Sequence, residues 1–282
     1  MRLGPEVLRI DPVLVEKTVE RFIRDYVESV GARGVVIGLS GGLDSSTTAF
    51  LAVRALGPER VIGLIMPEEE VYDPEAIRHA RMVAEHLGIR TEVVDITPIL
   101  KAIYGALPAY DPEDHMARAN LKPRVRMLCL YYYANRYGML VCGTTDKSEA
   151  MVGYYTKWGD GAADIEPIMD LYKTQVRQLA RHLGVPEEIV GKPPTPALLP
   201  GQTAEGELGL KYEVLDLILY GLEHFIPPER IAADVGVPLE TVLAVRARWL
   251  NNEHKRRPPI TIKLAYRTVG MDFRLPYALR RG

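Results

Sequence analysis

Residues 34–46 read Gly-Val-Val-Ile-Gly-Leu-Ser-Gly-Gly-Leu-Asp-Ser-Ser, and this stretch decides the fold. Its first half, Gly34–Leu39, is a short apolar run rich in β-branched residues, which predicts a buried strand. A glycine-rich turn follows, and a helical pattern then runs from about Ser45 to Leu56, where Gly57-Pro58 ends it. A buried strand that leads through a tight turn into a helix is a basic unit of α/β proteins.

The segments around this unit repeat the alternation of strands and helices. Their strands are apolar throughout rather than alternately apolar and polar, which is typical of parallel strands covered on both faces. We therefore predict an α/β fold with an open, mainly parallel, twisted sheet, helices on both faces and a helical C-terminal part. The expected strands are Val61–Met66, Thr91–Ile96 and Met139–Gly143, and the expected helices are Asp11–Val30, Pro74–Gly88, Met116–Tyr137, Tyr172–Leu183, Tyr212–Tyr220, Pro228–Asp234 and Pro238–Asn251.

Two later stretches lack a regular pattern. Gly191–Gly209 is too rich in proline and glycine to be regular, and long irregular connections in compact domains are often lids or binding loops. The chain after Pro258 is basic and irregular. We therefore expect a single α/β domain over residues 1–257 and a basic C-terminal tail over residues 258–282.

The composition narrows the class of protein. The 282 residues carry 35 Lys+Arg and 37 Asp+Glu, and the formal net charge of −2 argues against gross nucleic-acid binding. No apolar run approaches the roughly 18 residues that span a membrane, and the first 13 residues lack the apolar core of a signal peptide. We therefore expect a cytoplasmic protein that binds neither membranes nor nucleic acid.

The glycine-rich turn carries the sharpest chemical signal. A turn between a strand and a helix directs backbone N–H groups and a helix N-terminus at one point, which suits a phosphate group. The sequence has neither the Gly-Lys-Ser/Thr of a Walker A loop nor the glycine spacing of a dinucleotide fingerprint. Asp44 repels phosphate unless a cation lies between them, so it predicts a magnesium site. The alternative is a tight strand–helix turn with a good N-cap and no ligand.

Residues 40–45, Ser-Gly-Gly-Leu-Asp-Ser, resemble the pyrophosphate loop of the N-type ATP pyrophosphatases. Enzymes of this superfamily cleave ATP between the α and β phosphates and adenylate an oxygen of their substrate. The loop alone does not choose among the families in this superfamily.

Six further segments, in order along the chain, resemble those of one family, the NAD synthetases. The resemblance implies ATP-dependent amidation of deamido-NAD to NAD, through an adenylated carboxylate, with release of AMP and pyrophosphate. It covers roughly residues 15–257, so the expected domain is NAD synthetase-like. The matching segments are Asn120–Met127, Gly143–Glu149, Thr156–Pro167, Lys173 with Gln175–Arg177, Gly201–Glu205 and Glu253–Arg256.

The resemblance implies a role for particular residues. ATP and Mg²⁺ would be bound near the turn, with Asp44 and Glu149 as the metal carboxylates. Lys173 would face the α-phosphate, and Asp160 would either bind and deprotonate ammonium or serve only its Gly-Asp-Gly turn. The implied ATP-binding residues are Gly38, Leu39, Ser40, Gly41, Gly42, Leu43, Asp44, Ser45, Thr144, Lys173 and Thr195. The implied deamido-NAD-binding residues are Arg124, Lys157, Asp164, His254 and Lys255.

Some details of the resemblance stay open. Arg124 and Arg126 diverge by about 200° on a helix, so we favour Arg124 as the ligand residue and leave Arg126 a structural role. Ala204 stands where relatives with Gly-Gln-Thr often have Asp, so the role of that Asp in the loop is absent here or is taken by Glu205 or Glu207.

The nitrogen source and the assembly are also implied by the resemblance. Glutamine-dependent relatives carry an added amidase domain, for which there is no room before Ser40. We therefore expect the use of free ammonia, unless a separate glutaminase subunit supplies it. Family members of this type are commonly homodimers, and we expect the same here.

Two other functions remain as alternatives. One is a different adenylating enzyme of the same superfamily, such as a tRNA-modifying enzyme, which would predict appended basic domains and cysteines for sulfur transfer. The other is a DNA-binding module, because residues 228–242 scan like a helix-turn-helix with Gly236 at the turn.

Overall fold

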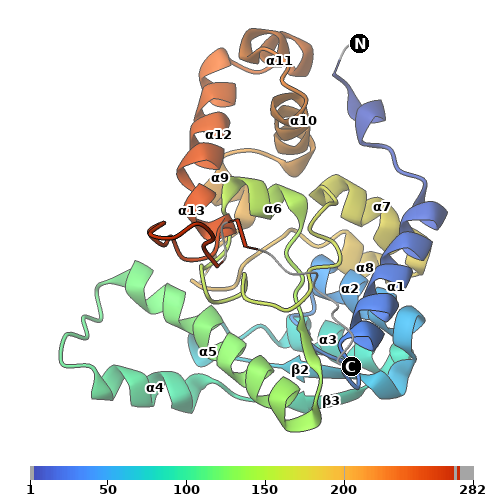
Figure 1. Cartoon of the computed structure of the whole chain (residues 1–282), viewed down its shortest axis with the longest axis vertical. Helices are drawn as coiled ribbons and strands as arrows, with labels where there is room; N and C mark the ends of the chain where they lie inside the picture. The colour runs from blue at the N-terminus through green and yellow to red at the C-terminus, as the bar shows by residue number, and fades with distance from the viewer. Residues whose placement is uncertain (1–2, 200, 270–271, 274–282) are drawn as a thin grey trace.

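The protein is built around a four-stranded parallel sheet (Figure 1). This structure is a computed structural model, and it describes residues 3–199, 201–269 and 272–273. The strand order is β3-β2-β1-β4, and every neighbouring pair is parallel. The predicted parallel sheet is therefore confirmed. The strands are β1 (Val35–Gly38), β2 (Val61–Ile65), β3 (Arg90–Val93) and β4 (Leu140–Cys142).

Both faces of the sheet are covered by helices, as the apolar strands predicted. Val35 and Ile37 of β1 belong to one hydrophobic core, and Val36 between them belongs to another. Because successive side chains of a strand point to opposite faces, these two cores lie on opposite sides of the sheet. The first core receives side chains from α1 (Pro12–Ser29), α2 (Leu43–Leu56), α3 (Pro74–Leu87) and α7 (Lys173–Leu183), and the second from α4 (Thr97–Ala106) and α5 (His115–Tyr137).

The C-terminal part is helical, as expected, and has a core of its own. Figure 1 shows α10, α11 and α12 grouped at one end of the molecule, beyond α6. Their apolar side chains pack with Leu8 near the N-terminus and with Val152 of α6. These helices are α6 (Lys147–Val152), α10 (Tyr212–Glu223), α11 (Pro228–Val235) and α12 (Leu239–Asn251).

Several short elements were not predicted from the sequence. Helix α4 was missed, and α6, with six residues, is too short to show a periodic pattern. Helix α9 (Ala204–Leu208) lies inside the stretch predicted to be irregular, where the Thr203 side chain caps its N-terminus by accepting a hydrogen bond from Gly206 N–H. The remaining short helices are η1 (Pro5–Leu8), η2 (Pro58–Arg60), η3 (Glu69–Val71), α8 (Glu187–Val190) and α13 (Glu253–Arg256).

The expected tail lies only partly within the described residues. Residues 258–269 and 272–273 contain an isolated bridge between Val269 and Phe273 but no helix or strand. Residues 270–271 and 274–282 lie outside the described part, and the boundary at residue 257 stays a prediction. In the part of the chain that the structure describes, no helix is both long and apolar enough to cross a membrane.

The connections of β1 place the candidate site. From β1 the chain passes to β2 and β3 on one side of the sheet, and β4 then pairs with β1 on the other side. In open α/β sheets, ligands bind outside the carboxyl ends of the strands at such a switch in strand order. The glycine-rich turn follows β1, and Thr144 follows β4, at this point.

Candidate active site

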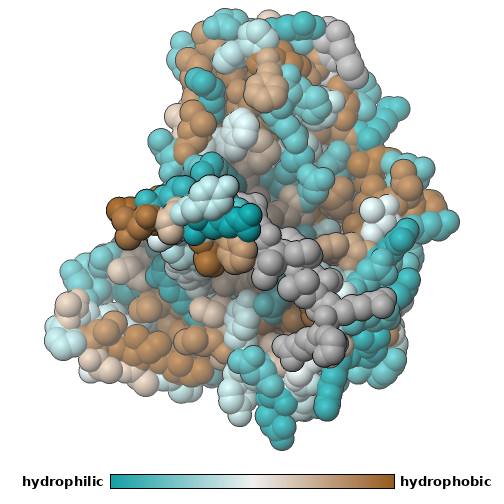
Figure 2. All heavy atoms as spheres, in the orientation of Figure 1, coloured by the Kyte–Doolittle hydropathy of each residue, from teal (hydrophilic) through white to brown (hydrophobic). Residues whose placement is uncertain are grey.

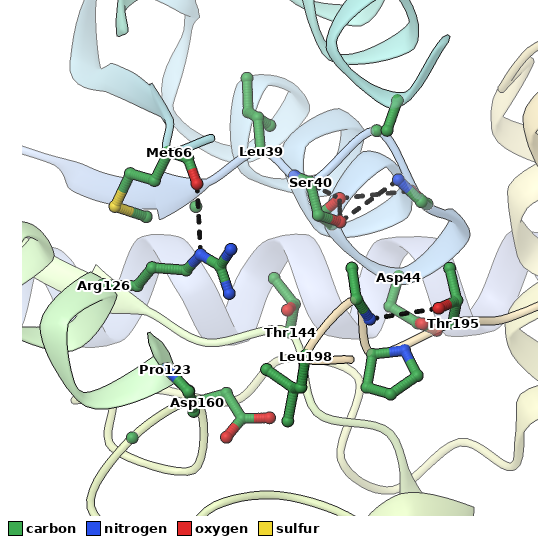
Figure 3. Close-up of a pocket in the computed structure, with 18 of the residues that line it drawn as sticks. Leu39, Ser40, Asp44, Met66, Pro123, Arg126, Thr144, Asp160, Thr195 and Leu198 are labelled. Carbon is green, nitrogen blue, oxygen red and sulfur yellow. Dashed lines mark hydrogen bonds between the residues drawn. The ribbon is translucent and has the colours of Figure 1, made fainter. Parts of the chain in front are cut away.

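A cleft opens beside the carboxyl ends of the strands (Figure 3). Its volume of about 320 Å³ lies in the range of small-molecule sites. Segments from before and after β4 form its walls. They include residues 38–45, residues 64–68 at the end of β2, residues 71–77, part of α5, residues 141–145, Glu149, residues 159–162 and residues 192–198.

The glycine-rich turn has the geometry of an anion-binding loop. Gly41 has a φ of +74°, and a Cβ atom there would lie 2.0 Å from the carbonyl oxygen of Ala76, so only glycine fits. The hydroxyl oxygens of Ser40 and Ser45 lie 2.9 Å apart and brace the turn. Gly42 caps α2 without a side-chain hydrogen bond, so the first N–H groups of this helix remain available to a ligand.

Three carboxylates from distant parts of the chain converge on one lysine next to this turn. The Lys173 ammonium lies 2.6 Å from Asp44 Oδ2, 2.8 Å from Asp146 Oδ2 and 2.9 Å from Glu149 Oε1. Asp44 and Glu149 line the cleft, whereas Asp146 and Lys173 are fully buried behind them. The structure thus brings together the two expected metal carboxylates and the lysine expected at the α-phosphate.

The charges in this cluster perturb one another strongly. Burial lowers the pKa of Lys173, but the negative charges of Asp146, Asp44 and Glu149 outweigh it and raise the pKa well above its ordinary value. Burial raises the pKa of Glu149 well above its usual range, despite the opposing effect of Lys173, and the pKa of Asp146 is raised for the same reason. Three carboxylates against one ammonium leave an excess of negative charge that a divalent cation would balance.

The residues of the cluster fit a magnesium ion. Carboxylate oxygens of Asp44, Asp146 and Glu149 lie within 4.8 Å of one another. Mg²⁺ prefers oxygen ligands and usually takes one or two carboxylates together with phosphate oxygens. Asp44 Oδ1 is buried and has no hydrogen-bond partner. Asp146 is less available, because its Oδ1 accepts a hydrogen bond from Glu149 N–H and its Oδ2 faces Lys173.

Thr144 and Thr195 line the cleft from two different segments, as expected for residues that contact one ligand. Thr144 lies between β4 and α6, and Figure 3 shows it between Arg126 and Asp44. Thr195 lies in the segment before α9, where its hydroxyl donates a hydrogen bond to the carbonyl oxygen of Gln202. An ion pair of 2.9 Å between Lys192 and Asp73 ties this segment to the start of α3.

Arg126 and Asp160 also line the cleft, although the sequence analysis gave Arg126 only a structural role. Arg126 Nε donates a hydrogen bond of 3.2 Å to the carbonyl oxygen of Met66, and its guanidinium extends into the cavity (Figure 3). Desolvation by the walls of the cleft raises the pKa of Asp160. One oxygen of Asp160 accepts a hydrogen bond of 2.7 Å from Thr156 N–H. This oxygen therefore stabilises the turn, which is one of the two roles expected for Asp160.

The residues expected to bind deamido-NAD are not among those that line this cleft. Arg124 Nη2 donates a hydrogen bond of 3.3 Å to the carbonyl oxygen of Lys157, which brings these two expected residues together. The Lys255 ammonium donates to the carbonyl oxygens of Gly153 and Tyr155.

The other two residues of this group are exposed. His254 is adjacent to Lys255 in α13. Asp164 accepts a hydrogen bond from Val141 N–H at 2.7 Å and therefore also holds the start of β4. Each of Arg124, Lys255 and Asp164 thus has a structural bond beside its expected role in binding.

Reasoning from the sequence missed Asp146 and Arg126. Asp146 lies inside the Gly143–Glu149 segment, where the motif assigns only its ends. The hint was an acid three residues before Glu149, the spacing of a helix cap, and the structure does show that capping box. The prediction that Arg124 and Arg126 point in different directions was correct, but helical spacing does not say which of the two faces the cleft.

Comparison with known proteins identifies the family of this chain. Residues 15–259 match the family model described as NAD synthase. An NH₃-dependent NAD⁺ synthetase of Hyperthermus butylicus is 51% identical over 255 residues, which are 90% of this chain and 92% of the relative. One of Methanocaldococcus jannaschii is 52% identical over 246 residues, which are 86% of this chain and 94% of the relative.

Solved structures of similar fold include two bacterial enzymes. An NMN synthetase of Francisella tularensis superposes with a TM-score of 0.80 at 30% identity and covers 91% of this chain and 100% of its own. An NH₃-dependent NAD synthetase of Campylobacter jejuni gives a TM-score of 0.76 at 28% identity, over 90% of this chain and 100% of its own. The family match over most of the chain, and relatives near half identical over nine-tenths of it, show that this chain belongs to the NAD synthase family.

Proposed function

We propose that the protein converts deamido-NAD to NAD with ATP and ammonia. An oxygen of the nicotinate carboxylate attacks the α-phosphorus of ATP, the bond to the β-phosphate oxygen breaks, and pyrophosphate leaves. Ammonia then attacks the carbonyl carbon of the mixed anhydride, loses a proton and displaces AMP. A carboxylate is a poor electrophile, and the adenylate supplies the leaving group that amide formation needs.

The observation that carries this proposal is the meeting of Asp44, Glu149 and Lys173 beside the glycine-rich turn. Asp44 comes from the first helix after β1, and Glu149 and Lys173 come from the half of the chain after β4. These three residues form a charged cluster next to a turn whose backbone N–H groups suit a phosphate group. This arrangement suits the transfer of a nucleotide group from ATP.

We assign the turn, Thr144 and Thr195 to ATP. Residues 38–45 present backbone N–H groups and hydroxyls to the phosphates, and Asp44 and Glu149 would hold Mg²⁺. The metal, when bound, neutralises phosphate charge and makes pyrophosphate a better leaving group. Lys173 supplies positive charge beneath the phosphate site, where negative charge develops on the α-phosphate.

We assign deamido-NAD to the region just outside the cleft. Arg124, Lys157 and Lys255 supply positive charge for the two phosphates of deamido-NAD, and Asp164 and His254 supply hydrogen-bonding groups. Asp160 projects into the cleft with a raised pKa, and a carboxylate there attracts ammonium and can accept its proton. The named relatives, which use NH₃, support free ammonia as the nitrogen source.

A mononucleotide is the alternative to deamido-NAD as the substrate, because one similar structure is an NMN synthetase. That name implies the amidation of a mononucleotide rather than a dinucleotide. The relatives of higher identity, at 51% and 52%, are NAD⁺ synthetases, which favours the dinucleotide. The two reactions share the adenylation chemistry and differ only in the group beyond the first phosphate.

The experiment supplies ATP and Mg²⁺ with either deamido-NAD or nicotinate mononucleotide, and with either ammonium or glutamine. The products are identified by mass spectrometry. We expect NAD and AMP from deamido-NAD with ammonium, and little product with glutamine. A higher kcat/KM for the mononucleotide would replace the proposed substrate, and the absence of AMP in every arm would refute the proposal.

We also propose that two copies of the chain associate through α5. Leu128 and Tyr132 are exposed by 58% and 68%, and their spacing of four places them on one face of the helix. Figure 2 shows apolar side chains gathered over the region of α4 and α5. Arg124 lies four residues before Leu128, so a second copy on this face would also lie next to the proposed dinucleotide site.

Light scattering after size exclusion tests this assembly. We expect a mass of twice the 31.5 kDa of the chain, and Leu128→Glu should reduce it to that of one chain. A wild-type protein that elutes at the mass of one chain would contradict the dimer.

A further inference from the structure

Helix α10 packs directly behind Lys173, although it belongs to the C-terminal group of helices. Two of its residues, Tyr212 and Asp216, have no exposed surface. They are four residues apart and therefore lie on the same face of the helix. This face meets α6 and α7, the two helices that carry Glu149 and Lys173.

The Asp216 carboxylate holds the start of α7 through two routes. Its Oδ2 accepts a hydrogen bond of 2.9 Å from Thr174 N–H. Its Oδ1 accepts one of 2.6 Å from the Ser148 hydroxyl, and the same hydroxyl oxygen accepts one of 3.0 Å from Lys173 N–H. The first N–H groups of a helix have no partner inside it. Here the buried carboxylate accepts from one of them directly, and the Ser148 hydroxyl that it holds accepts from the other.

Tyr212 contacts the other end of the same lysine. The Lys173 ammonium lies 5.2 Å from the centre of the Tyr212 ring, within the range of a cation–π contact. Helix α10 therefore fixes Lys173 at its backbone, through Asp216, and at its ammonium, through Tyr212. The ammonium is left pointing at Asp44, Asp146 and Glu149.

We propose that Asp216 is a positioning residue for the reaction, which acts through Ser148 and the start of α7 to hold the Lys173 ammonium among Asp44, Asp146 and Glu149. This inference rests on the proposed role of Lys173 at the phosphates of ATP. A buried carboxylate is costly, and no lysine, arginine or histidine is paired with Asp216 among the described ion pairs. Its two oxygens are both used as acceptors, which asparagine cannot reproduce.

Three variants test the proposal. Asp216→Asn removes one acceptor at nearly constant volume, and Ser148→Ala removes the hydroxyl but keeps the Thr174 bond. Glu213→Gln is the matched control, because Glu213 also links α10 to α7, through an ion pair with Arg177 at the surface. We expect kcat to fall about tenfold or more in the first two variants, with the KM for deamido-NAD changed less than about twofold, and no change in the control.

The same substitutions in a Lys173→Met background distinguish an effect of Asp216 on the position of Lys173 from an effect on the structure as a whole. If Asp216 acts through Lys173, then Asp216→Asn lowers the residual rate of Lys173→Met little further. An equal fold-loss in both backgrounds would show a structural role and overturn the inference. If Asp216→Asn does not fold, Ser148→Ala carries the same comparison.

The failure of the inference can be told from the failure of the proposed function. Full activity of Lys173→Met would remove the proposed role of Lys173 itself. Loss of activity in Lys173→Met, together with wild-type kcat in Ser148→Ala and Asp216→Asn, would overturn only the positioning role.

Discussion

Lys173 Nζ lies 2.6 Å from Asp44 Oδ2, although 129 residues separate the two in the sequence. The contact joins the helix after the glycine-rich turn to the helix that follows the Gly-Asp-Gly segment. It exists because β4 pairs with β1, so that the segments after both strands meet at one edge of the sheet. The Asp44 side chain is partly exposed to the cleft and that of Lys173 is buried, so the Asp44 carboxylate faces the ligand while the Lys173 ammonium lies behind it.

Asp44→Asn should abolish AMP formation and leave the fold intact. The substitution removes the charge that would hold the metal, whereas Asp146 and Glu149 still neutralise Lys173. We expect a loss of at least about 100-fold in kcat, as for other groups that stabilise transferring phosphates. The control is Asp25→Asn, which removes an exposed carboxylate of α1. Near-normal AMP formation in Asp44→Asn would contradict the magnesium assignment.

Magnesium should stabilise the protein without any substrate. A ligand that binds only the folded state raises its stability, by about 2.7 kcal/mol at 100 times its Kd. We expect Tm to rise when EDTA is replaced by millimolar Mg²⁺, and Glu149→Gln to remove most of this rise. Glu187→Gln, which changes an exposed carboxylate of α8, should keep it. An equal rise in both variants would place the metal elsewhere.

Gly41→Ala should distort the turn and weaken ATP binding. The new Cβ atom would meet the carbonyl oxygen of Ala76 at 2.0 Å, so α3 or the turn must move. Gly31→Ala is the matched control, because Gly31 has a similar φ of +70° with no atom within 4 Å of the new Cβ.

Both variants carry the same backbone strain, so the difference between their free energies of unfolding measures the clash at Gly41 alone. We expect Gly41→Ala to be less stable than Gly31→Ala by about 1–3 kcal/mol. Calorimetry with Mg·ATP should show lost affinity only in Gly41→Ala, and equal affinities would refute a phosphate role for the turn.

Glu166 should make the protein less stable as the pH rises. Burial raises the pKa of Glu166 from 4.5 to about 8, and the Asp160 charge adds to this, while a hydrogen bond from Thr145 N–H opposes it. The folded protein therefore holds a proton that the unfolded chain releases above pH 4.5. The stabilisation is complete below that pH and is lost between pH 4.5 and about 8, with a slope of at most about 1.4 kcal/mol per pH unit.

Urea unfolding at several pH values checks this prediction. Glu166→Gln cannot titrate, so the wild type should lose stability relative to this variant from pH 5 to pH 8. Parallel stability profiles of the two proteins would show that Glu166 has an ordinary pKa in the folded state.

The sequence predicted the architecture well because its strands and long helices carry strong local patterns. The strand Val35–Gly38 and the helices α1, α3 and α5 were found within a few residues of their observed bounds. Helices α6 and α9 were missed because they span less than two turns and depend on caps, at Asp146 and Thr203, rather than on periodicity. Tertiary packing, not local propensity, makes them form.

The candidate site was predictable residue by residue only through the family resemblance. The turn and Asp44 carried a physical signal of their own, because an acid beside a phosphate loop calls for a cation. Asp146 carried only the spacing of a helix cap, and Asp216 carried no signal, since a buried acid looks like any other in the sequence. Their roles follow from the packing of α6, α7 and α10, which a one-dimensional pattern does not contain.

The central claim is that the nicotinate carboxylate is adenylated, and an isotope experiment tests it most directly. Deamido-NAD labelled with ¹⁸O in that carboxylate is incubated with ATP, Mg²⁺ and ammonium, and the AMP is examined by mass spectrometry. The proposed mechanism predicts that each AMP carries one ¹⁸O atom from the carboxylate and that the NAD keeps the other. Unlabelled AMP, or ADP with labelled phosphate, would contradict it.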